Sequence, residues 1–379
     1  MINSQRLGEL FKTLVEIDSI SRKEKQVGLA LEKILTGMGA VVRYDNAAEK
    51  VNGDCSNLVA KFKGTVKADP LFLCGHMDTV EPGEGIKVTF RDGVFRSDGT
   101  TILGSDDKSA LAIIIEVMQV LLENKIDHPP VEVVFTVCEE IGLLGAKHFD
   151  YSLMDSTFGY ILDSTDTEGI VTRAPAANKI TLKVHGRAAH AGAAPEKGID
   201  AIAVASAAIS KLALGRIDEE TTCNLGTIHG GVATNIVPEF VEIHGEARSQ
   251  EPEKLEAVTR TIVDAFKAAA KSFEDGSGFP RIDVLIENDF SNTRIPEDHR
   301  VVTLARQAAE NLGQAMESKT IGGGADANIF FGKGIMAGVL GTGMTDVHTL
   351  NESIKLDDMV RSATLILEIL KIHARESRK

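Results

Sequence analysis

The stretch LFLCGHMDTV, residues 71–80, begins with four apolar residues and passes through Gly75 to His76 and Asp78. The apolar run predicts a buried strand, and residues i and i+2 of an extended chain point to the same side. His76 and Asp78 can therefore face one point, with Asp78 behind the imidazole. A metal-bound histidine usually has such a partner. The same residues also fit a buried strand that runs into a polar turn.

Other predicted segments end in polar residues in the same way. The apolar run Val131–Val137 leads into Glu139 and Glu140, and Phe158–Leu162 ends at Asp163. Between the first two runs, residues 104–108 (GSDDK) open a nearly all-apolar helix over 109–122. Strands that alternate with helices predict an α/β sheet with its site at the strand ends.

The pattern changes after about residue 177. Strand-like and helix-like segments then follow one another in the order β-α-β-β-α-β over residues 178–292, with an alanine-rich helix over 199–214. This order is that of the ferredoxin-like arrangement, and the length suits a separate domain. We therefore predict a catalytic domain made of residues 1–177 and 293–379, with an α+β domain inserted at 178–292.

Composition limits the classes of partner. The 379 residues have a formal net charge of −14, which argues against binding to nucleic acid or to an anionic membrane surface. The four cysteines show no CxxC spacing and fit a reducing compartment. The first residues lack the continuous apolar core of a signal peptide, and the most apolar run, 110–122, is too short to cross a bilayer. We expect a cytoplasmic protein.

The polar residues at the predicted strand ends are of the types that bind metal ions. They are His76, Asp106 or Asp107, Glu139, Glu140, Asp163 and His348. Two imidazoles and several carboxylates suit a pair of divalent ions, zinc first and cobalt or manganese as alternatives. In the Glu139-Glu140 pair, one carboxylate can bind metal while the other takes a proton from metal-activated water. The alternative is a set of solvated loop acids.

The order of the motifs along the chain resembles that of the di-zinc aminoacylase/carboxypeptidase/tripeptidase family, and most of all its peptidase T-like members. The motifs are GHMDTV, GSDDKSALA, CEEIGLLGAKH, ILDST, AAHAGAAPEKGIDA, IHGGVATNIVPE, GEARS and TDVHTLNE. They extend over nearly the whole chain. The resemblance implies a mixed-sheet zinc-peptidase catalytic domain with a ferredoxin-like lid that also forms a dimer.

The resemblance also implies a role for each residue of the site. His76 and Asp163 would complete the shell of one zinc, with Asp78 orienting His76. Asp106 would bridge both metals, and a cis peptide bond would follow it. Glu140 and His348 would complete the shell of the second zinc, and Glu139 would be the general base. Asp107 could instead be the N-cap of the helix that follows.

Three residues of the inserted domain complete the implied site. His229, in IHGGVATNIVPE, resembles the histidine that reaches the active site of the partner subunit and stabilises the oxyanion. Asn235 and Arg248 resemble substrate anchors, and Arg248 suits a carboxylate. The resemblance implies a homodimer formed through the inserted domain.

Two features point to different ends of the substrate. The family's aminopeptidases tend to have an aspartate at the position of Asp163, which favours a tripeptidase or aminopeptidase that acts on short peptides. The loop with His190 reads HAG, as in glutamate carboxypeptidases and aminoacylases, where tripeptidases tend to have HPG. An N-acyl-amino-acid amidohydrolase or carboxypeptidase with the same metals is therefore the alternative. A catalytically silent, dimeric peptide-binding protein is a more remote one.

Overall fold

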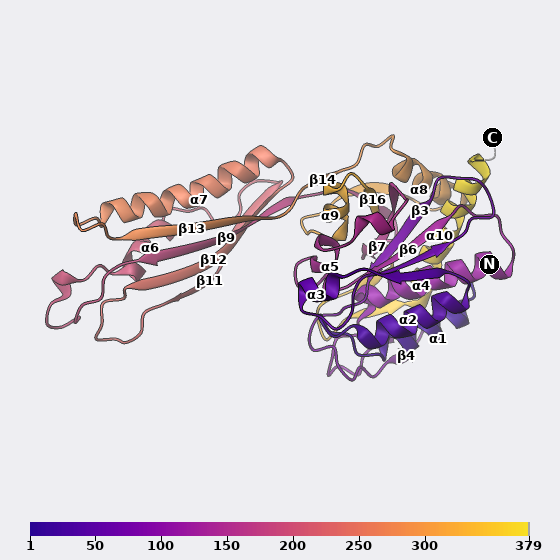
Figure 1. Cartoon of the computed structure of the whole chain (residues 1–379), viewed down its shortest axis with the longest axis horizontal. Coiled ribbons are helices and arrows are strands. Elements are labelled where there is room, and N and C mark those ends of the chain that lie inside the picture. Colours follow the sequence, from indigo (N-terminus) through magenta and orange to yellow (C-terminus); the bar gives the residue numbers. More distant parts are fainter. Residues whose placement is uncertain (378–379) are drawn as a thin grey trace. The chain divides into compact units, whose positions relative to one another are not determined.

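The structure, a computed structural model, describes residues 1–377, which form two compact units (Figure 1). The first unit contains Met1–Thr172, Arg294–Thr320 and the chain from Ala325 onward, and the second contains Arg173–Thr293 and Ile321–Gly324. The boundary drawn from the sequence at 177/178 lies inside strand β9 (Ala176–His185). The contacts place the division earlier in the chain, between Thr172 and Arg173, before this strand begins.

The first unit is built on a nine-stranded sheet with the strand order β1-β2-β6-β3-β7-β16-β8-β14 and with β15 paired to β8. The bounds are β1 Val41–Tyr44, β2 Leu58–Phe62, β3 Leu71–His76, β6 Val131–Thr136, β7 Phe158–Ser164, β8 Gly169–Ala174, β14 Thr293–Arg294, β15 Glu317–Thr320 and β16 Met336–Gly341. β3 runs parallel to both β6 and β7, and β16 runs parallel to β7, whereas β2 is antiparallel to β6. The sheet is mixed, as predicted. Every residue of β3 and of β6 is buried, which explains their continuous apolar sequences.

Helices cover this sheet. Their bounds are α1 Ser4–Val15, α2 Lys25–Gly37, α3 Ala47–Val51, α4 Ser105–Glu123, α5 Leu144–Lys147, α8 Arg300–Asn311, α9 Asp326–Gly332 and α10 Leu356–Glu376. α4 contacts β3 as well as α1 and α10. Its residues from Ser105 to Met118 are all buried, so the apolar character predicted for this helix is that of a helix enclosed on most sides.

A small four-stranded sheet in the order β17-β18-β5-β4 completes the first unit. Its strands are β4 Thr89–Arg91, β5 Val94–Arg96, β17 Met344–Thr345 and β18 Ser353–Lys355. Asp92 and Gly93 form the hairpin turn between β4 and β5, and both have positive φ. This sheet joins a segment near residue 90 to the loop between β17 and β18.

The second unit has a five-stranded antiparallel sheet in the order β10-β11-β12-β9-β13. The bounds are β9 Ala176–His185, α6 Ala201–Ile209, β10 Gly215–Arg216, β11 Thr221–Gly230, β12 Phe240–Ser249, α7 Pro252–Ser272 and β13 Arg281–Phe290. α6 and α7 pack their buried residues against the apolar side chains of β9 and β12 in one core. Apart from the short β10, the order of elements is the predicted ferredoxin-like one.

Several segments differ from the prediction, among them β16 and α6. β16, in the middle of the large sheet, was missed because its sequence, MAGVLG, contains two glycines, which weaken a strand pattern. The helix predicted over 199–214 is shorter, since α6 ends at Ile209. In the part of the chain that is described, no helix is both long enough and apolar enough to span a bilayer.

Candidate metal centre

Three adjacent strands of the large sheet bring the candidate ligands together. β3 ends at His76, Glu139 and Glu140 follow β6, and Asp163 lies near the end of β7. The register pairs His76 with Thr136, three residues before Glu139. Because β3 is parallel to β6 and β7, the ends of all three strands meet at one edge of the sheet.

Side chains from these strand ends and from the start of α4 form two overlapping groups of candidate ligands. His76, Asp106 and Glu140 make one group, and Asp106, Asp107 and Asp163 make the other, with the ligand atoms of each group within 4.8 Å of one another. Asp106 belongs to both groups, as a bridging carboxylate would. The geometry groups His76 with Glu140, whereas the resemblance paired it with Asp163. The assignment of each ligand to one of two ions stays a prediction.

His348 reaches the same cluster from the loop between β17 and β18. Its Nε2 lies 3.1 Å from Oδ2 of Asp106 and 3.0 Å from Oε1 of Glu140. On the other side of Asp106, Nε2 of His76 lies 3.1 Å from Oδ1. The five side chains predicted as ligands are therefore gathered in one place, although they come from five separate segments.

Asp78 differs in detail from its predicted role. Nδ1 of His76 is 2.9 Å from the backbone carbonyl oxygen of Asp78 and 3.5 Å from its carboxylate. That carboxylate instead accepts hydrogen bonds from the backbone N–H groups of Glu139, at 2.9 Å, and Glu140, at 3.2 Å. Asp78 thus contacts the imidazole mainly through its main chain and the two successive glutamates through its side chain.

Asp107 is fully buried beside Asp106, and the peptide bond between them is cis, as expected. Oδ2 of Asp107 accepts a hydrogen bond of 3.1 Å from the backbone N–H of His76. Within the described chain, its Oδ1 is buried without a hydrogen-bond partner. Asp106 and Asp107 have non-helical φ and ψ, so the regular part of α4 begins after Asp107. The N-cap role considered for Asp107 stays a prediction, and its carboxylate lies against the backbone of His76.

The cluster concentrates negative charge in a buried place. Burial works to raise the pKa of Asp106, but hydrogen bonds with His348 and His76 lower it below its usual range. Burial, followed by the charge of Asp106, raises the pKa of Asp163 to about 7. Hydrogen bonds to Asp106 and Glu140 raise the pKa of His348 to about 10. The carboxylates need positive partners, and divalent cations would supply that charge.

Glu139 is also buried at this site. Burial raises its pKa well above the usual value, and the neighbouring carboxylates Asp163, Asp326 and Glu140 act in the same direction. A carboxyl group with a raised pKa is suited to take up and return a proton near neutral pH. This is the behaviour that a general base requires.

Several buried acids around the site were missed from the sequence. Glu24 accepts a 3.0 Å hydrogen bond from the backbone N–H of Cys138. Asp326, the first residue of α9, accepts one of 2.6 Å from the hydroxyl of Thr136. Glu352 accepts several hydrogen bonds from the segment before Asp107. Two of the three had a local signal. Glu352 ends the motif TDVHTLNE, and Asp326 closes the glycine-rich segment GGGAD, residues 322–326.

The three predicted residues of the inserted domain lie in the second unit. His229 is an exposed residue near the end of β11, and Asn235 is exposed in the loop that follows. The guanidinium of Arg248 makes two 3.0 Å hydrogen bonds to the carboxylate of Glu246. Arg248 therefore binds the carboxylate of Glu246 through Nε and Nη2, and its predicted contact with substrate stays a prediction.

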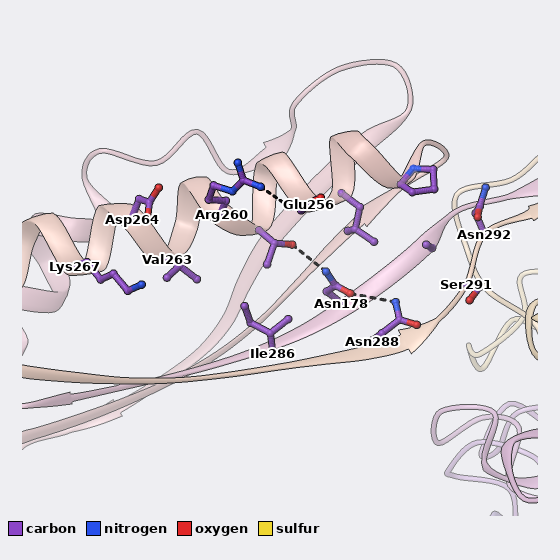
Figure 2. A pocket seen from close by; sticks show the side chains of 14 residues that line it. Asn178, Glu256, Arg260, Val263, Asp264, Lys267, Ile286, Asn288, Ser291 and Asn292 are labelled. Atoms are coloured by element: carbon purple, nitrogen blue, oxygen red, sulfur yellow. Dashed lines mark hydrogen bonds and ion pairs between the residues drawn. The ribbon is translucent and has the colours of Figure 1, made fainter.

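The second unit also contains a groove of about 490 Å³ between α7 and the sheet. Figure 2 shows its polar floor, where Asn178 donates to Thr259 at 3.1 Å and accepts from Asn288 at 3.2 Å. Arg260, Asp264 and Lys267 of α7 lie along its rim (Figure 2). None of the candidate metal ligands lines this groove.

One family model matches most of the chain. Residues 72–372 match the family described as peptidase family M20/M25/M40. The uncharacterized protein YqjE of Bacillus subtilis (strain 168) is 41% identical over 376 residues, which are 99% of this chain and 100% of that protein.

Two solved structures resemble nearly the whole chain. Aminopeptidase PepT from Bacillus cereus ATCC 10987 has 39% identity and a TM-score of 0.91, over 98% of this chain and 99% of that one. A tripeptidase from Staphylococcus aureus subsp. aureus Mu50 has 39% identity and a TM-score of 0.94, over 99% and 100%. The chain therefore belongs to peptidase family M20/M25/M40 and is a metal-dependent peptidase.

Proposed function

We propose that this peptidase removes residues from the free amino end of short peptides and uses two divalent ions. Zinc is the first choice, with cobalt or manganese as alternatives. The observation that carries the proposal is the convergence of His76, Asp106, Glu140 and His348 around one point, with Asp163 beside Asp106. The aminopeptidase and the tripeptidase named above support the choice of substrate.

The donor set fits two such ions. Two imidazoles and three carboxylates, with Asp106 shared between both groups, are ligands that zinc, cobalt and manganese accept. When bound, the ions would lower the pKa of water and polarise the scissile carbonyl. Cysteine is absent from the two groups, as expected for a catalytic rather than a structural zinc site.

The residues of the chain then divide the work. The carboxylate of Glu139 takes the proton from the attacking water and later gives it to the leaving amine. The backbone N–H groups of Glu139 and Glu140 donate hydrogen bonds to the carboxylate of Asp78, whose carbonyl oxygen contacts His76. These contacts fix the position of the two glutamates relative to His76. A base held in this way needs little rearrangement when the reaction occurs.

We assign the substrate contacts to the second unit. The proposal is that residues 178–292 form a lid and the surface of a homodimer, while 1–177 and 293–379 form the catalytic domain. His229 of one subunit would donate a hydrogen bond to the developing oxyanion in the partner subunit, and Asn235 and Arg248 would anchor the peptide. We further propose a cytoplasmic location, which the four unpaired cysteines support.

The role of Glu139 is tested by E139Q in metal-loaded protein. We expect turnover of a tripeptide to fall by a factor of about 10²–10⁴, the usual contribution of a general base, while metal content stays near two ions per chain. Turnover and metal content are measured on the same sample. Substantial remaining turnover would show that Glu139 is not the base.

The end of the substrate that the enzyme recognises is tested with three related peptides. A free tripeptide, its N-acetylated form and its C-amidated form are compared by kcat/KM. An aminopeptidase loses the N-acetylated substrate and keeps the amidated one. The opposite result would favour a carboxypeptidase or deacylase, which the HAG sequence at His190 suggests. Binding without turnover of all three would indicate a silent peptide-binding protein.

A further inference from the structure

Glu352 lies just before β18 and is almost fully buried, with 1% of its surface exposed. Its Oε2 accepts hydrogen bonds of 2.8 Å from the backbone N–H groups of Leu103 and Gly104. Its Oε1 accepts from the hydroxyl of Ser105, at 2.6 Å, and from the backbone N–H of Asp106, at 3.0 Å. One carboxylate thus accepts four donors from a single segment.

These donors lie where the chain enters α4. Leu103 and Gly104 precede the helix, and Ser105 and Asp106 are its first two residues. Asp106 and Asp107 have non-helical φ and ψ, so the regular part of the helix begins after them. The backbone N–H groups of this irregular segment lack helical partners, and Glu352 supplies their acceptor from a distant part of the chain.

The position of Glu352 links two candidate ligands. His348 and Glu352 lie in one loop, between β17 and β18, which pair with each other. β18 is also fixed to β5 by backbone pairing. Glu352 contacts the main chain of Asp106, and His348 lies 3.1 Å from the carboxylate of the same residue. Glu352 and the strand pairing thereby hold the carboxylate of Asp106 and the imidazole of His348 next to each other.

We propose that Glu352 is a positioning residue of the metal centre, which fixes the backbone of Asp106 relative to His348 and so raises the affinity for the ions. The inference rests on the proposed two-ion site. Residues that orient metal ligands typically contribute a factor of about 10–100 in metal affinity. If Glu352 had a purely structural role, it would stabilise the fold without raising the affinity for metal ions.

The test is E352Q in the full-length protein. Glutamine keeps the shape of the side chain, but its NH₂ group would face two donors, so the hydrogen bonds on that side of the group are lost. The affinity of metal-free protein for Zn²⁺ is measured by competition with a chromophoric chelator, and the absorption spectrum of the Co²⁺-loaded protein reports ligand geometry. We expect E352Q to bind about 10–100 times more weakly, with an altered Co²⁺ spectrum.

Glu132 provides a matched control. It is another buried carboxylate that accepts from backbone N–H groups, those of Asp155 and Ser156, and it lies in the first part of β6, away from Glu139. E132Q should lower the thermal stability, as E352Q does, and leave the affinity for Zn²⁺ at the wild-type value. An equal loss of affinity in both variants would overturn the proposal, because it would reveal a general effect of stability.

The remaining outcomes are also decisive. Folded E352Q with wild-type affinity for Zn²⁺ overturns the positioning role. If E352Q does not fold, E352D takes the same measurement, since it keeps the charge and withdraws the carboxylate by about 1.5 Å. Wild-type affinity in E352D would then overturn the proposal, and weaker binding would support it. Failure of the wild-type protein to bind Zn²⁺ would instead refute the two-ion site itself.

Discussion

Two buried carboxylates, Glu24 and Asp78, hold the backbone of the turn Cys138–Glu140. Glu24 accepts from the N–H of Cys138, and Asp78 accepts from the N–H groups of Glu139 and Glu140. The turn has an unusual conformation, with Cys138 at a φ of 53°. Successive hydrogen bonds from the protein interior can maintain such a backbone where the sequence alone would not favour it.

Glu24 leads to a prediction about pH and stability. Burial, followed by the charge of Asp78, raises its pKa from 4.5 to about 7, and the thiols of Cys55 and Cys138 also lie near it. Between these two pKa values the folded protein holds a proton that the unfolded chain has released. Stability should therefore fall as the pH rises from about 4.5 to 7, by up to about 3 kcal/mol from this residue.

The measurement is urea unfolding of metal-free wild-type protein and E24Q over this pH range. The difference in free energy of unfolding between the two should change with pH in the stated direction. E9Q, at an exposed position, is the control for the substitution itself. A difference between wild type and E24Q that does not depend on pH would contradict the prediction.

At the scale of elements, the contact between β3 and α4 places His76 next to the paired aspartates. Gly75 makes this approach possible, because a Cβ on it would lie 2.7 Å from Oδ2 of Asp107 and 2.8 Å from Cβ of Ala110. Both distances are shorter than side-chain packing allows. The glycine in the opening stretch of the sequence therefore has a packing role next to the site.

We predict that G75A moves the start of α4 away from β3. The free energy of unfolding should fall by about 1–3 kcal/mol, as for other overpacked positions, and the affinity for Zn²⁺ should decrease with it. Denaturant unfolding and chelator competition measure the two effects. G37A, in α2, is the matched control, since a Cβ there meets nothing within 4 Å. G37A should be neutral or stabilising by about 0.5–1 kcal/mol, and a G75A variant as stable as G37A would show that α4 adjusts freely.

At the scale of the whole molecule, each unit has a hydrophobic core of its own. All five proposed metal ligands belong to the first unit. Binding of metal should therefore stabilise the first unit directly, by neutralising its buried carboxylates. The core formed by α6, α7 and the second sheet does not contain these charges.

Removal of the metal should consequently affect the two units differently. An ion at 100 times its dissociation constant stabilises the folded state by about 2.7 kcal/mol. After chelation we expect faster hydrogen exchange in β3, β6 and α4, and unchanged exchange in β9, β12 and α7. Mass spectrometry of peptides from both units measures this. An equal change in both would show that the ions stabilise the molecule as a whole.

The sequence predicted much of the fold because the relevant signals are local. Apolar runs predicted β3, β6 and β7, and the order of elements predicted the ferredoxin-like unit. β16 lacked such a signal, because Gly338 and Gly341 interrupt it where neighbouring residues lie close. α6 was predicted too long, since an alanine-rich segment does not show where a helix ends.

For the site, residue type and position at strand ends were sufficient to name His76, Asp106, Glu140, Asp163 and His348 as candidate ligands, because metal chemistry restricts which side chains can serve. Their convergence, and the contact of Asp107 with His76, required the tertiary structure. The same is true of Glu352, whose donors lie 246 to 249 residues away in the chain. Sequence periodicity reports which face of an element is buried, whereas a hydrogen bond between distant segments depends on how the chain packs in space.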